Sequence, residues 1–231
     1  FGKIMNIKLA LSEERLKILS ECMQNYDVGA DTDEWPNNII SRFTSVYNDG
    51  AISKHNIPLQ HEIDSDELKL CQKLSAEITN IMANVEVGMG SNSGDYFQDF
   101  YIMHPQNSAS QKITPQLIQQ YFANTIFPLA NITTEPLTTN TQWWEEVEQD
   151  GEESPAEYFQ PWHKMINWFA AQHDFIDCAF VRIGDSALLE QINSDNYPKG
   201  TIITGCVLPR LALGLTQKSS LVGIFGYVVH S

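Results

Sequence analysis

The chain has 231 residues, 42% of them hydrophobic, and its 14 basic and 29 acidic residues give a formal net charge of −15. This composition is that of a folded domain with a core, and it excludes a disordered tail, a collagen-like fibre and a low-complexity linker. So strong an acidic balance repels phosphate backbones, so we expect no binding to nucleic acid.

The sequence favours a cytoplasmic protein that does not enter a membrane. No apolar run approaches the roughly 18 residues that a membrane-spanning helix needs. The first residues lack the continuous apolar segment of a secretory signal and soon carry acidic side chains. The four cysteines, which are far apart and form no C-x-x-C pair, are predicted to be mainly buried free thiols: Cys22, Cys71, Cys178 and Cys206.

The first third of the chain is predicted to be mainly helical. Residues 5–11 alternate between apolar and polar side chains, which is typical of a short strand, and Ser12 then has the character of a helix N-cap. A second helix is expected after Asp33, with an apolar stripe over residues 39–47. A third is expected over residues 65–83, where apolar side chains recur at spacings of three and four.

The middle of the chain changes character. Extended segments are expected at residues 85–89 and 96–104, and Pro115 after Thr114 then marks the start of a helix, since proline suits the first helical position. A polar stretch and an acidic run follow. The segment Ser154-Pro155-Ala156-Glu157 has the pattern of a capping box, which predicts a helix that Pro161 should kink or restart.

The last third is predicted to consist mostly of strands, with one short helix at residues 186–193. The expected strands are Phe175–Ile183 and residues 200–208, 211–216 and 221–229, with a bend at Pro209 and a hairpin at residues 217–220. Helices that precede strands indicate the α+β class: a helix-rich N-terminal half and middle packed on a C-terminal, mostly antiparallel β-meander. We expect a single domain over residues 1–231, with a weak division near residues 131–153.

Sequence motifs of common catalytic and metal sites are missing. Gly88, Gly90 and Gly94 are spaced one residue away from the dinucleotide fingerprint, and an extended pattern follows them, so a hairpin or surface loop is favoured. There is no P-loop, no H-E-x-x-H, no zinc-type cysteine–histidine spacing and no G-x-S-x-G. We therefore expect neither a metal nor a cofactor, while the question of enzymatic activity stays open.

The first candidate site lies where two tryptophans precede the acidic run. Exposed aromatic and acidic side chains together favour an interface with a basic protein. The alternatives are that both tryptophans belong to the core and that the acids form a solvated, flexible loop. The candidate partner-binding residues are Trp143, Trp144, Glu145, Glu146, Glu148, Glu152 and Glu153.

The second candidate site lies on the C-terminal strands. Alternation places Arg210 on one face of its strand with Ala212 and Gly214, and small side chains leave room above a sheet. If Arg182 faces the same side, the two guanidinium groups could bind a carboxylate or phosphate, with His163 as a further ligand-binding residue that can move a proton. The alternative is that each arginine pairs with an acid of the chain.

Two functions of different classes follow from these sites. We favour a non-enzymatic protein-binding module, inhibitor-like, immunity-like or regulatory, which binds a basic partner. The alternative is a small-molecule-binding protein or enzyme with an anion pocket on the C-terminal sheet. A third hypothesis is a subunit whose aromatic stripe at residues 158–169 is buried in a neighbour, because a sequence does not distinguish a core stripe from an interface stripe.

Overall fold

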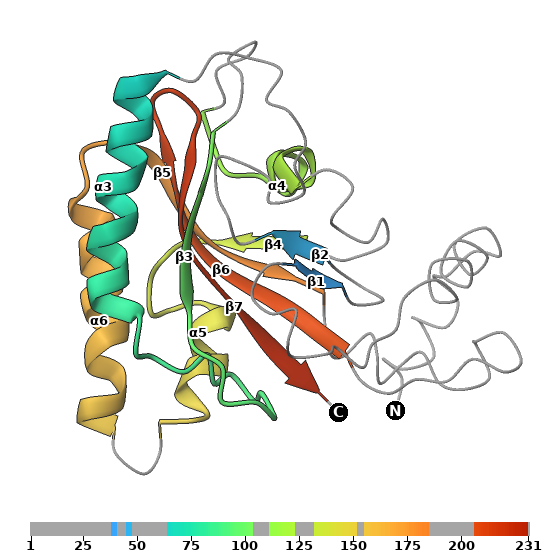
Figure 1. Ribbon diagram of the computed structural model, residues 1–231. Helices are drawn as coiled ribbons and strands as arrows, with labels where there is room; N and C mark the ends of the chain where they lie inside the picture. The colour runs from blue at the N-terminus through green and yellow to red at the C-terminus, as the bar shows by residue number, and fades with distance from the viewer. Residues whose placement is uncertain are drawn as a thin grey trace, which may run out of the picture.

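The computed structural model describes residues 38–40, 45–47, 64–103, 111–122, 132–151, 155–184 and 206–230. Its helices are α3 (Ser65–Met82), α4 (Pro115–Phe122), α5 (Gln142–Glu148) and α6 (Pro155–Ala171). Its strands are β1 (Asn38–Ile40), β2 (Ser45–Tyr47), β3 (Gln98–Ile102), β4 (Ile132–Glu135), β5 (Phe175–Ile183), β6 (Cys206–Thr216) and β7 (Leu221–His230). The α+β class expected from the sequence is confirmed (Figure 1). The elements expected at residues 5–11, after Ser12 and at residues 186–193 lie outside the described residues.

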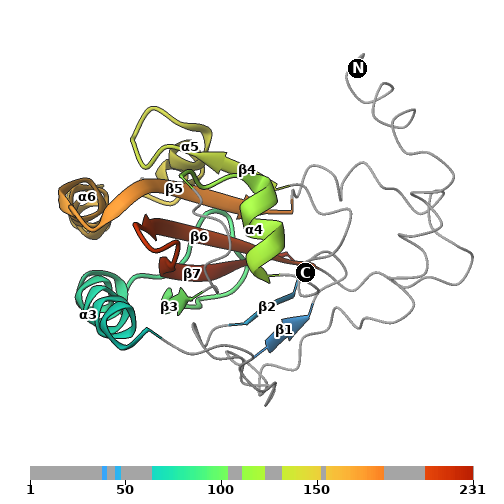
Figure 2. The same cartoon turned by 90° about the horizontal axis from the view of Figure 1, so that it is seen from above.

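One antiparallel sheet organises the described chain. Its strands follow the order β3-β7-β6-β5-β4, which can be followed from edge to edge in Figure 2. From β4 to β7 each strand pairs with the next one along the chain, and β3 closes the other edge beside β7. The C-terminal strands therefore form the expected meander, and the expected hairpin joins β6 to β7.

Helices cover both faces of the sheet. Helices α3 and α6 lie side by side on one face, and α4 lies on the other (Figure 1). Alternation in β6 directs Leu211, Leu213 and Leu215 toward the α4 side, whereas Ala212 joins the cluster formed with α3, α5 and α6. The two faces of β6 are thus assigned as its sequence pattern predicts.

Two predicted helix starts are confirmed by their caps. The Asp64 carboxylate accepts hydrogen bonds from the backbone N–H groups of Asp66 and Glu67, at 3.0 and 3.1 Å, ahead of α3. The Thr114 hydroxyl accepts one from Leu117 N–H at 3.1 Å, ahead of α4. Both contacts satisfy N–H groups that a helix leaves free in its first turn.

The helix prediction after Asp33 is wrong for the residues that the structure describes there, 38–40 and 45–47. Strands β1 and β2 pair antiparallel there, with Ile39 opposite Val46. The apolar stripe was consistent with a helix, but short apolar runs do not separate the two periods. The β-branched and aromatic residues in this stretch favour strands, because their restricted side chains suit a pleated surface.

Prolines interrupt neither β6 nor α6. Strand β6 continues through Pro209, which is in register with Tyr227 of β7, instead of forming two strands with a bend. The last pair with β5 is Arg182–Arg210, so Pro209 lies beyond the end of that ladder, where a missing N–H is tolerated. Helix α6 likewise runs continuously through Pro161 instead of restarting there.

Strand β4 was not expected from the sequence. It lies in the polar stretch after residue 131 and pairs with β5, with Thr133 opposite Arg182. A polar strand at the edge of a sheet lacks the apolar run by which buried strands are recognised. This strand and α5 bring much of the stretch at residues 132–151 onto the common sheet.

Aromatic rings fill the room above the small residues of the sheet. A Cβ atom added to Gly214 would lie 2.5 Å from the ring of Phe175. A Cβ atom on Gly226 would meet the side chains of Val87 and Phe97 at 2.4 and 2.9 Å. The small-residue face is therefore a packing surface for bulky neighbours and has no open space above Gly214.

We predict that Gly214→Ala lowers the free energy of unfolding by about 1–3 kcal/mol, because the added methyl group overlaps the Phe175 ring. Urea denaturation measures the change. Gly94→Ala is the control, since its added Cβ would come no closer than 3.9 Å to Glu86 Oε1. Equal midpoints for Gly214→Ala and the parent chain would contradict the packing described above.

Candidate functional site

Strand pairing brings the two arginines of the C-terminal sheet together. Arg182 of β5 and Arg210 of β6 are direct cross-strand partners. Directly opposed residues of an antiparallel pair point to the same face, with Cβ atoms about 5 Å apart. The condition set by the sequence, that both arginines face one side, is met.

A single carboxylate bridges the two guanidinium groups. Glu146 of α5 lies 2.7 Å from Arg182 Nη1 through one oxygen and 3.5 Å from Arg210 Nε through the other. Arg182 also pairs with Glu135 of β4 at 3.2 Å and donates to the Gln142 side chain at 3.2 Å. We call Glu135, Glu146, Arg182 and Arg210 the arginine network.

Arg210 is the most buried member of the arginine network, with only 3% of its surface exposed. Its Nη1 group donates to the backbone carbonyls of Pro209, Ile183 and Gly184 at 3.1, 3.4 and 3.4 Å. Buried charges are found almost always with opposite charges and hydrogen-bond acceptors, and here both are supplied from within the chain. The place that an external anion would take between the arginines is filled by Glu146.

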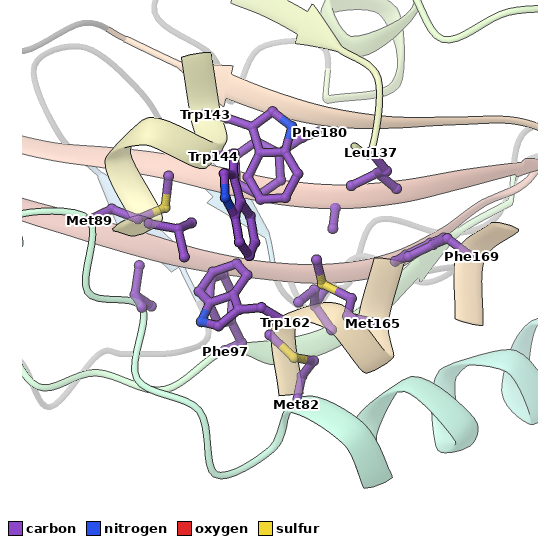
Figure 3. Packing of buried hydrophobic residues seen from close by; sticks show 14 of the residues in the cluster. Met82, Met89, Phe97, Leu137, Trp143, Trp144, Trp162, Met165, Phe169 and Phe180 are labelled. Atoms are coloured by element: carbon purple, nitrogen blue, oxygen red, sulfur yellow. The ribbon is translucent and has the colours of Figure 1, made fainter. Parts of the chain in front are cut away.

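The acidic run is not a flexible loop where the structure describes it. Residues 142–148 form α5, and its apolar side is buried in the core, with 0% of Trp143 and 4% of Trp144 exposed. The Trp143 ring stacks on Phe180 of β5 at 4.3 Å, and its indole N–H donates to Pro136 O at 2.9 Å. Figure 3 shows these indoles gathered with Trp162 of α6. The tryptophans therefore lie as in the alternative in which both belong to the core.

The acids of α5 point in two directions. Glu146 faces the sheet and enters the arginine network, whereas Glu145 and Glu148 are exposed. Glu148 also accepts a hydrogen bond from Trp144 Nε1 at 2.8 Å. The side chains at positions 152 and 153, Glu152 and Glu153, lie outside the described residues.

The third ligand-binding candidate lies apart from the arginines. His163 is exposed on α6, and its ring is 5.2 Å from Trp144 and 6.4 Å from Phe159. It makes no described ion pair, hydrogen bond or ring contact with Arg182 or Arg210. The sequence indicated separate sites for the arginines and the acidic run. The fold joins them through Glu146, which pairs with both arginines.

The glycine-rich segment contacts the chain just after α5, which the sequence did not predict. Glu86 and Tyr96 pair as an isolated antiparallel bridge, so the segment is the hairpin that its pattern favoured. Its turn has three consecutive positive φ angles, at Gly88, Met89 and Gly90. The Asp150 carboxylate, just after α5, accepts a hydrogen bond from Gly90 N–H at 3.1 Å. The glycines signalled a turn, but nothing in their spacing linked it to Asp150.

Two cysteines that the structure describes have inert surroundings. Burial raises the pKa of the Cys71 thiol to about 12, against hydrogen bonding to Ser220, which lowers it. Burial, followed by the nearby charge of Asp177, raises the pKa of Cys178 to about 12. Both thiols therefore stay protonated at neutral pH, and a protonated thiol is a poor nucleophile.

The described residues form neither a cluster of metal ligands nor a membrane-spanning helix. In the described ranges, no three histidine, cysteine or acidic side chains gather as metal ligands would. None of the helices placed by the structure has the length and apolar character to cross a bilayer. No family model matches the chain, and no curated protein is similar to it in sequence. The function proposed below therefore rests on the contacts and the exposure of the described residues.

We predict that iodoacetamide at pH 8 leaves Cys71 and Cys178 unmodified in the folded protein and labels both in urea. With a pKa near 12 instead of 9, the thiolate fraction of each is about a thousandfold smaller. Peptide mass spectrometry identifies the labelled sites, and rapid labelling of either cysteine without urea would contradict the burial.

The raised pKa values of Cys71 and Cys178 also predict that the free energy of unfolding falls as the pH rises from 9 toward 12, because the thiols lose their protons first in the unfolded chain.

We predict that Glu146→Gln lowers the free energy of unfolding by about 3 kcal/mol, because it leaves Arg210 and Arg182 short of one opposite charge in a buried setting. Glu145→Gln removes the same charge from an exposed position and should change stability by less than about 0.5 kcal/mol. Urea denaturation compares the two variants. Equal effects would show that Glu146 is not the buried counter-charge.

Proposed function

We propose that the chain is a non-enzymatic module that binds a basic partner protein through the exposed acids of α5. The observation that carries this proposal is the two-sided character of the helix. Trp143, Trp144 and Val147 are buried on one side, and Glu145 and Glu148 are exposed on the other. The exposed carboxylates therefore stand on an anchored helix and not on a loop.

Anchoring favours recognition because it reduces the entropy that binding must overcome. A rigid element loses little conformational freedom when a partner binds, whereas a flexible acidic loop would lose much more. The net charge of −15 adds a long-range field that attracts a cationic partner and accelerates its encounter. Both features support a surface that acts through charge.

The arginine network argues against the alternative function. An anion pocket needs guanidinium groups that a ligand can reach, but Arg210 is buried and shares the Glu146 carboxylate with Arg182. The room expected above Gly214 is also occupied, by Phe175. These contacts favour a structural role for the arginines, and the exposed acids are left as the feature available to a partner.

The test is capture from an extract of the source cells by the immobilised chain at low salt. We expect captured proteins of basic isoelectric point that are released by salt, since a Debye length of about 3 Å at 1 M screens exposed charges. The variant Glu145→Gln/Glu148→Gln should lose these proteins. Its glutamine at position 148 can still accept the Trp144 hydrogen bond, so the fold is preserved.

A matched control removes the same amount of charge elsewhere. Asp66 lies in the first turn of α3 and Asp174 follows α6, and the variant Asp66→Asn/Asp174→Asn should capture the same proteins as the parent. Quantitative mass spectrometry compares the three samples. Retention of the basic proteins by Glu145→Gln/Glu148→Gln, or equal loss in both double variants, would reject α5 as the binding surface.

A further inference from the structure

An exposed aromatic residue lies on the hairpin that Asp150 contacts just after α5. Tyr96 has 52% of its surface exposed, and only Ile176, at 39%, is also a large exposed hydrophobic residue in the described ranges. Tyr96 is the bridge partner of Glu86, and paired residues of an antiparallel bridge point to the same side. An exposed tyrosine ring therefore has a carboxylate as its direct neighbour.

The end of α5 and the start of α6 meet the same hairpin. Asp150 holds the hairpin turn by accepting a hydrogen bond from Gly90 N–H at 3.1 Å. A Cβ atom placed on Gly88 would lie 2.7 Å from Asp150 Oδ2 and 2.9 Å from the hydroxyl oxygen of Tyr158. The Asp150 carboxylate and the Tyr158 phenol thus both lie close to the backbone at Gly88. We call the set of Glu86, Tyr96, Asp150 and Tyr158 the Tyr96 surface.

Tyr158 adds an unused hydrogen-bonding group to this place. Its hydroxyl oxygen is covered and forms no hydrogen bond with the protein. A covered hydroxyl without a partner is costly, since it has lost its water and gained nothing in return. Burial, then the charges of Asp150 and Glu86, raise the pKa of Tyr158 to about 12, so both carboxylates act on the same phenol.

We propose that the Tyr96 surface binds an arginine side chain of the basic partner, with the guanidinium group between Glu86 and Asp150 and against the Tyr96 ring. This inference rests on the proposed function and names the group that the partner supplies. Arginine fits better than lysine, because its planar group pairs with carboxylates through several N–H donors and also stacks on an aromatic face.

The first test uses dye-labelled hexaarginine and measures its dissociation constant by fluorescence anisotropy. We expect Tyr96→Ala to weaken binding about threefold, which corresponds to the loss of an exposed cation–π contact. Ile176→Ala removes the other exposed large apolar side chain and should leave the affinity unchanged. Dye-labelled hexalysine should bind the parent chain more weakly than hexaarginine and should lose less affinity in Tyr96→Ala.

A second variant separates binding from folding. Tyr158→Phe removes a hydroxyl that has no protein partner, so the free energy of unfolding should stay equal or rise. Because this hydroxyl is covered, the same variant should leave the hexaarginine affinity unchanged, so it is a control next to the site. Glu86→Gln should weaken hexaarginine binding, and its control is Asp174→Asn, which removes one charge at a distant position.

Unchanged hexaarginine affinity in Tyr96→Ala and Glu86→Gln, or equal binding of hexalysine, would overturn the inference. Its failure is distinguishable from failure of the proposed function. If basic proteins depend on Glu145 and Glu148 but not on Tyr96, the binding module stands and the arginine site does not. If the extract yields no salt-sensitive basic protein, the proposed function itself fails.

Discussion

Two arginines on the face of the sheet that α3, α5 and α6 cover need opposite charges around them. Pairing of β5 with β6 makes Arg182 and Arg210 neighbours, and the helices that cover this face exclude water from Arg210. Buried like charges repel each other and cost several kcal/mol without counter-charges. Glu146 and Glu135 supply those charges, so α5 and β4 are held to the sheet by ion pairs as well as by packing.

The position of α5 then determines what the surface presents. Its tryptophans pack against the sheet, with Trp143 stacked on Phe180, and this direction of packing turns Glu145 and Glu148 outward. Asp150, just beyond the helix, reaches the hairpin that carries Tyr96. Acidic side chains from a short helix and a separate hairpin thus become parts of one region, which supports charge-based recognition of a partner.

Elements with explicit start signals or a long apolar repeat were predictable, whereas most of the short ones, β3 excepted, were not. Helix α3 has an apolar stripe over many turns, and α4 has Thr114 and Pro115 at its start, so local interactions select these helices. Strands β1, β2 and β4 and helix α5 contain few residues each. For such short segments, contacts with the rest of the fold outweigh local preference, as the pairing of β4 with β5 shows.

The sequence by itself determined the α+β class, the two faces of β6 and the strong negative charge, because these follow from composition and from the alternation of neighbouring residues. Only the tertiary structure decided which charges are available to a partner. Arg182 and Glu146 are 36 residues apart in the chain, yet they form an ion pair at 2.7 Å. Electrostatic interaction depends on distance in space and on exclusion of water, and local sequence specifies neither for such a pair.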